Sequence, residues 1–135
     1  MILVDTMVLS ELRKARPNTS VITYLNAQLP NTVFLSAMTI GEIGAGIEKQ
    51  RDISPEFTEE FAQLLMLMEL QFAQHILPVT PAIAKLWARL CFQTGNKGID
   101  NLIAAAALVH NLLVVTRNGK DFEVAGVRVL DPYEA

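Results

Sequence analysis

The run Ile2–Val4, followed at once by Asp5, is the feature that most restricts how this chain can fold. Three consecutive apolar residues without polar alternation are typical of a short strand buried on both faces, although such a run alone also fits a buried helix. Asp5 then stands where a buried strand ends and a helix-like segment, Val8 to Leu12, begins. In open α/β sheets ligands bind outside the carboxyl ends of the strands, so Asp5 is a candidate site residue.

Strand-like and helix-like segments alternate along the whole chain. We expect strands at residues 2–4, 32–35, 76–80, 112–116 and 127–130. We expect helices near residues 6–14, 19–25, 40–47, 55–72, 81–91 and 99–110, the last Ala-rich and buried. This alternation is typical of α/β proteins. It predicts a three-layer α/β/α fold with a four- or five-stranded, mainly parallel sheet.

The size and composition of the chain fit one globular domain over residues 1–135. Hydrophobic residues make up 51% of the 135 and charged residues 19%, which excludes a disordered chain. No apolar run is long enough to span a membrane, and no basic region typical of a signal peptide precedes the first strand. The single Cys91 is expected in the core and fits a cytoplasmic location. The net charge of -3 argues against nucleic-acid binding through bulk positive charge, but not against metal-assisted chemistry on nucleic acid.

Proline and capping residues mark several helix starts. Ser54-Pro55 and Thr80-Pro81 each combine a capping residue with proline at the first helical position. The helix after Ser54 carries an apolar stripe from Phe57 to Phe72, of which we expect part to contact another protein chain. Near the end of the chain, we expect Asp121 to cap a final turn. His75 and His110 are isolated and are interpreted as structural or surface residues.

Acidic and amide side chains are expected at one edge of this sheet. Asp5, Thr116 and Asn118 follow predicted strands, Glu42 lies about a turn into the helix after the second strand, and Asp100 opens the Ala-rich helix. If that helix packs along the rim, three acids and an amide converge there. Such oxygen ligands suit a hard divalent cation, which can activate water for displacement at phosphorus.

Each acid also has a purely local alternative. Glu42 fits a capping box that begins at Thr39, Asp100 fits an ordinary helix N-terminal acid, and Asp5 fits a plain helix cap. Asp5 resists this alternative best, because a carboxylate that ends a buried strand is costly to desolvate without a partner. Basic residues at 13, 14, 16, 117 and 120 fit either a rim for a phosphodiester backbone or scattered surface charge.

Four blocks of this sequence resemble PIN-domain proteins, particularly toxins of the VapC and FitB type. The blocks are Leu3–Glu11, Ser36–Ile43, Asp100–Ala107 and Val115–Phe122, in the family's order and spread over the whole chain. The resemblance implies a Mg²⁺- or Mn²⁺-dependent ribonuclease that acts on RNA, pairs with an antitoxin and is usually a homodimer.

The same resemblance assigns the site residues. It implies that Asp5, Glu42 and Asp100 form the acidic, metal-binding centre and that Asn118 takes the fourth site position. Two positions depart from the family's pattern: Met7 stands where Asn is usual, and Asn118 where many relatives have Asp. Both departures reduce the polar or charged ligands.

Two other functions compete with the ribonuclease hypothesis. The first is a catalytically weakened PIN-like module that binds an antitoxin, RNA or both, which Met7 favours. The second is a phosphoacceptor receiver domain, which needs an acid at the end of its third strand. Here the third strand ends in Pro78-Val79-Thr80, without an acid, so the receiver domain ranks far lower.

Overall fold

A computed structural model describes residues 1–134 and places a five-stranded parallel sheet between two layers of helices. The strands are β1 (Ile2–Val4), β2 (Val33–Ser36), β3 (Ile76–Leu77), β4 (Leu113–Val115) and β5 (Val129–Leu130). Their order across the sheet is β3-β2-β1-β4-β5. The N-terminal strand therefore lies in the middle, and the predicted three-layer α/β/α fold is confirmed.

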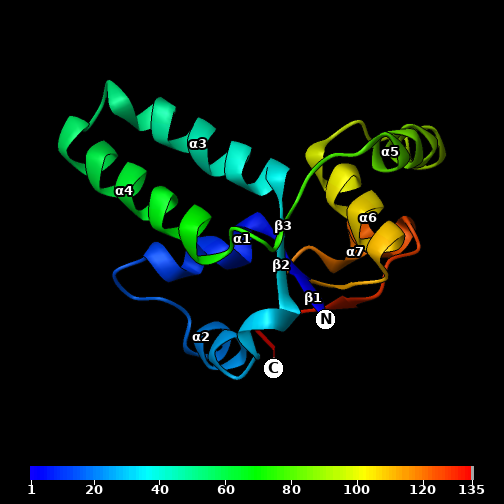
Figure 1. Cartoon of the computed structure of the whole chain (residues 1–135), viewed down its shortest axis with the longest axis horizontal. Helices are drawn as coiled ribbons and strands as arrows, with labels where there is room; N and C mark the ends of the chain where they lie inside the picture. Colours follow the sequence, from blue (N-terminus) through cyan, green and yellow to red (C-terminus); the bar gives the residue numbers. More distant parts are fainter. Residues whose placement is uncertain (135) are drawn as a thin grey trace.

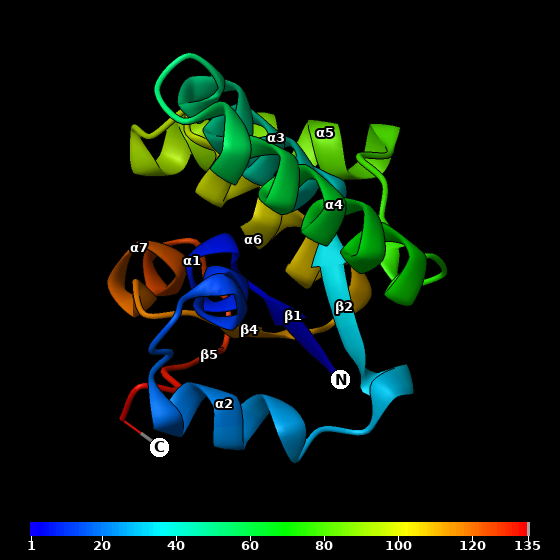
Figure 2. The same cartoon turned by 90° about the vertical axis from the view of Figure 1, so that its left-hand side faces the viewer.

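The helices divide between the two faces of the sheet, as Figure 1 shows. One face is covered by α1 (Thr6–Leu9), the 3-10 turn η1 (Ser10–Arg13), α2 (Thr19–Asn26), α3 (Ala37–Arg51) and α4 (Pro55–Gln71). The other is covered by α5 (Pro81–Thr94), α6 (Ile99–His110) and α7 (Gly119–Val124). A second 3-10 turn, η2 (Pro30–Thr32), precedes β2. Helices α3 and α4 pair as a hairpin that extends away from the strands (Figures 1 and 2).

Alternating side chains of the strands form two separate cores. Leu3 of β1 packs with the α5–α7 layer, whereas Ile2 and Val4 pack with the α1–α4 layer. The predicted central position of the Ala-rich helix is confirmed, because the segment 103–107 of α6 is fully buried. Among residues 1–134, no helix combines the length and hydrophobicity that crossing a membrane requires.

Most helices start near the predicted positions, although α3 begins at Ala37 and α7 forms where the sequence predicts only a turn. One capping mechanism is corrected. The side chains of Asn18, Ser36 and Thr80 accept hydrogen bonds from backbone N–H groups of α2, α3 and α5, respectively. Ser54 precedes α4 as predicted, but its side chain makes no capping hydrogen bond. Its backbone carbonyl instead accepts the hydroxyl of Thr58 at 2.9 Å. Proline at the first position thus marks this helix without a side-chain cap.

The interpretation of His75 as a structural residue is confirmed. Its Nδ1 lies 3.0 Å from the carbonyl oxygen of Val33. Its ring stacks on Phe34 with centroids 4.7 Å apart. These contacts hold the segment before β3 against β2.

We predict that Phe122 anchors α7 to the sheet. Its side chain is fully buried, whereas Val124 on the same helix is 69% exposed. Phe122→Ala should lower the free energy of unfolding by about 3–5 kcal/mol. Val124→Ala, the control, should change it by less than about 0.5 kcal/mol. Urea unfolding at pH 7 measures both, and equal losses would show that α7 is not held by this ring.

Candidate active site at the carboxyl edge of the sheet

The site forms where the chain changes direction across the sheet. From β1 the chain runs outward through β2 and β3, and it then returns to β4 on the other side of β1. Ligand crevices of open α/β sheets lie outside the carboxyl ends of the strands at such a switch point. Asp5 directly follows β1 and Thr116 directly follows β4, so both residues stand at this point.

Asp5 is a buried carboxylate held by two neutral donors. Its side chain caps α1, because Oδ1 accepts the backbone N–H of Thr6 at 2.8 Å. Its Oδ2 accepts the hydroxyl of Thr116 at 2.8 Å. Asp5 is 7% exposed and Thr116 is fully buried. Asp5 is therefore a helix cap, as the local alternative proposed. Capping uses only one of its two carboxylate oxygens, however.

Glu42 reaches the same edge from α3. Its Oε1 accepts the hydroxyl of Thr6 at 2.6 Å, and that hydroxyl lies 3.1 Å from the hydroxyl of Thr39. The capping-box alternative for Glu42 is wrong, because α3 begins at Ala37 and Ser36 is its cap. Thr6 thus joins Asp5 to Glu42, its backbone bonded to one and its side chain to the other.

Asp100 and Asn118 meet from α6 and the start of α7. Asp100 lies in the first turn of α6, and its Oδ2 is 3.5 Å from the Nδ2 of Asn118. The same Nδ2 donates to Asp121 Oδ2 at 2.7 Å. The prediction that Asp121 caps a final turn is wrong, because Asn118 is the residue that precedes α7. The structure adds Asp121 to the group instead. A spacing of three residues from Asn118 is compatible with this contact, but the spacing alone does not predict it.

Mutual repulsion links the carboxylates electrostatically. Burial raises the pKa of Asp5, hydrogen bonds from Thr116 and Thr6 partly oppose this, and the charge of Glu42 raises it further. Burial also raises the pKa of Asp100, and the charges of Asp5 and Asp121 add to the shift. Four acids therefore act on one another at this edge.

The donor set fits a divalent cation. Among residues 1–134 the ion pairs are Lys14–Glu11 and Arg51–Glu48, so no Lys or Arg neutralises the four acids. Within the same residues, no three His, Cys, Asp or Glu side chains converge tightly enough to enclose an ion. The acids are thus neighbours at this edge rather than a closed ligand set. Oxygen-only ligands of this kind suit Mg²⁺ or Mn²⁺.

Three of the five basic residues at positions 13, 14, 16, 117 and 120 have partners within the protein. Lys14 pairs with Glu11, Arg13 lies over the ring of Phe61, and Arg117 lies over the ring of Tyr133. These contacts favour a structural role for Arg13, Lys14 and Arg117 over the alternative that they bind a phosphodiester backbone.

Comparison with known proteins places the chain in a family. A family model described as "PIN domain" matches residues 2–127, so the chain belongs to the PIN-domain family. It is 33% identical to VapC ribonuclease Y4jK of Sinorhizobium fredii, over 99% of each chain. The crystal structure of FitAcB from Neisseria gonorrhoeae matches with a TM-score of 0.81 and 31% identity, over all of both chains.

A further solved structure supports the same grouping. A toxin-antitoxin complex from Klebsiella pneumoniae matches with a TM-score of 0.76 and 29% identity, over all of both chains. Together these matches confirm the resemblance to toxins of the VapC and FitB type. They also set aside the receiver-domain alternative.

We predict that replacing Asp5 by Asn stabilises the metal-free protein at neutral pH. The folded-state pKa of Asp5 is raised, so its ionisation opposes folding as the pH rises through that value. Asn caps a helix as well as Asp does, so the capping contact survives. The gain in unfolding free energy should be present at pH 7 and vanish near pH 3.

Chemical denaturation of Asp5→Asn in the presence of a chelator tests this, with exposed Asp52→Asn as the control. A loss of stability at pH 7 in Asp5→Asn alone would contradict the prediction.

Proposed function

We propose that this protein is a metal-dependent endoribonuclease that acts as the toxin of a toxin–antitoxin pair and hydrolyses phosphodiester bonds in RNA. The observation that carries the proposal is the cluster of uncompensated carboxylates at the switch point of a PIN-family sheet. The similarity to a VapC ribonuclease over nearly the whole chain supports the same activity. The single-domain organisation of residues 1–135 and the cytoplasmic location stay predictions.

Asp5 and Asp100 are the proposed main metal ligands. Glu42 helps to hold the ion or orients the attacking water, Asn118 occupies the fourth position, and Asp121 adds negative charge beside it. A Mg²⁺ or Mn²⁺ ion bound there supplies charge neutralisation and a more acidic water for in-line displacement.

Neutral side chains keep these acids in place. Thr116 orients the second oxygen of Asp5, and Thr6 orients Glu42. Asn118 donates to Asp121 and approaches Asp100. Because these donors carry no charge, they fix the carboxylates without competing with a cation for them.

The second candidate function is a weakened PIN-like module that binds an antitoxin or RNA without efficient cleavage. Met7, directly after Thr6, is 54% exposed and offers only a thioether where a polar side chain is usual in the family. Asp121 weighs against this candidate, because it supplies a fourth acid although Asn118 is neutral. Cleavage of RNA by the purified protein separates the two candidates.

An apolar cavity of about 500 Å³ is the proposed contact region for an antitoxin. Its lining comes from β1, the α1–η1 segment, α2 and the end of α4, and includes Leu9, Leu12, Leu25 and Phe72. Apolar side chains on neighbouring α4 are also exposed, namely Met66, Leu67 and Leu70. These three residues do not belong to the apolar stripe predicted from Phe57 to Phe72. Within that stripe, Met68 is buried and Phe57 is 61% exposed. The exposed α4 residues are proposed to form the homodimer contact.

The first prediction from this function concerns catalysis. Asp5→Ala should abolish RNA cleavage, at least about 10³-fold, because a direct metal ligand is lost. Chelator should abolish cleavage by the unaltered protein, and Mg²⁺ or Mn²⁺ should restore it. Asp52→Ala, at an exposed carboxylate that ends α3, is the control. Undiminished cleavage by Asp5→Ala would rule the mechanism out.

The second prediction concerns the metal load. Ligand charge tunes the affinity of oxygen sites, so Met7→Asn and Asn118→Asp should each tighten Mn²⁺ binding. We expect one weakly held ion in the unaltered protein, and Asp121→Asn should weaken it further. Calorimetric titration with Mn²⁺ measures all four proteins. Two tight sites in the unaltered protein, or no gain in either of the first two variants, would show that these positions do not set the metal load.

The third prediction concerns self-association. Leu67→Glu and Leu70→Glu place charge on side chains that are 61% and 70% exposed, so the fold should tolerate them. If this surface is a homodimer contact, both variants should be monomers by analytical ultracentrifugation. Phe92→Glu on α5, which is 91% exposed, is the matched control and should leave the oligomeric state unchanged.

A further inference from the structure

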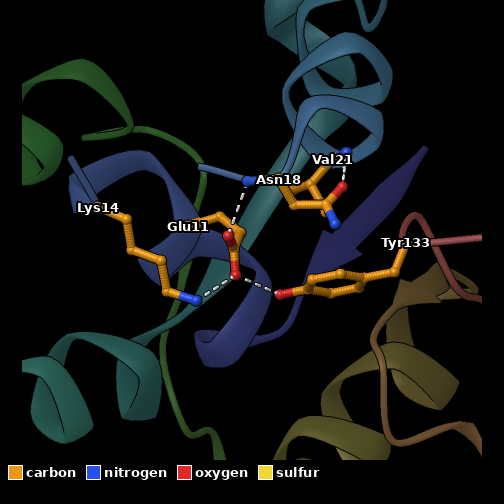
Figure 3. Close-up of polar contacts among 5 residues, drawn as sticks. All are labelled: Glu11, Lys14, Asn18, Val21 and Tyr133. Atoms are coloured by element: carbon orange, nitrogen blue, oxygen red, sulfur yellow. Dashed lines mark hydrogen bonds and ion pairs between the residues drawn. The ribbon is translucent and has the colours of Figure 1, made fainter. Parts of the chain in front are cut away.

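A buried carboxylate outside the candidate site joins Lys14 and Asn18, which are close to it in sequence, to Tyr133, 122 residues away (Figure 3). Glu11 of η1 is 3% exposed. It accepts the Nζ of Lys14 at 2.7 Å, the backbone N–H of Asn18 at 3.0 Å and the hydroxyl of Tyr133 at 2.8 Å. These donors, led by Lys14, lower the pKa of Glu11 to about 2. Glu11 is therefore a permanently charged acceptor at neutral pH.

Tyr133 brings the segment after β5 to this carboxylate. Burial and the bond to Glu11 raise the pKa of the Tyr133 hydroxyl to about 12, so it stays a donor. The backbone N–H of Tyr133 donates to Asp131 Oδ1 at 2.9 Å, and Pro132 between them is buried. The hydroxyl of Tyr133 and its backbone N–H are thus each bonded to a carboxylate, in addition to the contact with Arg117.

The face of the same ring supports Arg117. The Arg117 guanidinium lies 4.5 Å from the ring centroid of Tyr133, well within the range of a cation–π contact. Arg117 stands between Thr116, which donates to Asp5, and Asn118, which contacts Asp100 and Asp121. Thr116 and Asn118 therefore contact site acids, whereas Arg117 between them contacts the Tyr133 ring.

We propose that Tyr133 is a positioning residue of the candidate active site, which fastens the site segment 116–118 to Glu11 through Arg117. The proposal rests on the proposed ribonuclease function. Within residues 1–134 no hydrogen bond joins Tyr133 to a site acid, so Arg117 is its direct link to the site segment. Glu11 closes the connection, because η1 directly continues α1, the helix that Asp5 caps. Glu11 is thus connected both to the segment after β1, which carries Asp5, and to the segment after β4, which carries Asn118.

Variants of Tyr133 separate its two contacts. Tyr133→Leu removes both the ring face and the hydroxyl, whereas Tyr133→Phe keeps the ring under Arg117 and loses only the bond to Glu11. Arg117→Gln removes the cation from an exposed side chain. Tyr24→Phe is the matched control, since Tyr24 is the other tyrosine of the chain and belongs to the α1–α4 core.

Two readouts are needed, one of them independent of activity. The first is RNA cleavage with Mn²⁺, measured well below the unfolding temperature of each variant. The second is the side-chain amide resonance of Asn118 in ¹⁵N NMR spectra of the metal-free protein. Thermal unfolding of each variant reports stability separately.

Positioning predicts a graded pattern. Tyr133→Leu and Arg117→Gln should each lower kcat roughly 10-fold with KM nearly unchanged, because small displacements of site groups reduce rates strongly. Both should shift the Asn118 resonance, and the double variant should show no larger effect than either single one. Tyr133→Phe should lie between Tyr133→Leu and the unaltered protein. Tyr24→Phe should change neither readout.

The Asn118 resonance decides the proposal even if the unaltered protein cleaves no RNA. In that case the proposed function fails, yet a shift in Tyr133→Leu still supports positioning. An unchanged Asn118 resonance in Tyr133→Leu overturns the proposal, whatever happens to stability or cleavage. Tyr133 would then hold the chain together without setting the site.

Discussion

The hydrogen bond from Thr116 to Asp5 is the interaction on which the rest of the site depends. It joins residues that follow β1 and β4, which are separated by most of the chain, at 2.8 Å in a buried position. A buried carboxylate is unfavourable unless donors surround it. Here the donors are a hydroxyl from the end of β4 and a backbone N–H from the start of α1. The cost of burying Asp5 is thus met only when strand order and helix start are both correct.

Sheet order explains why the remaining acids arrive at the same place. With β1 in the middle of the sheet, the segments that leave β1, β2 and β4 all emerge at one edge. Helix α3 leaves from β2 with Glu42, and α7 leaves from β4 with Asp121. Helix α6, packed in the core beneath β4, brings Asp100 at its first turn. Fully apolar strands and an Ala-rich helix therefore determine where polar side chains from four segments meet.

Local patterns in the sequence were sufficient for the fold and for part of the site. Apolar runs and capping residues predicted the strands and the cap at Thr80, because these depend on neighbours in sequence. Asp121 was misjudged because its role depends on the side-chain direction of Asn118, which helix periodicity does not specify. Glu11 was missed because one of its donors, Tyr133, lies 122 residues away. No local pattern encodes a hydrogen bond over such a separation.

The two buried carboxylates, Asp5 and Glu11, show how one side-chain chemistry serves opposite purposes. The pKa of Glu11 is lowered to about 2 because Lys14 supplies a positive partner, and its charge is satisfied within the protein. The pKa of Asp5 is raised, because its donors are neutral and its charged neighbour is another carboxylate. A lysine beside Asp5 would stabilise the metal-free fold but would compete with the proposed divalent cation for this carboxylate. Neutral donors orient Asp5 without neutralising its charge, and the proposed binding of a divalent cation requires that charge.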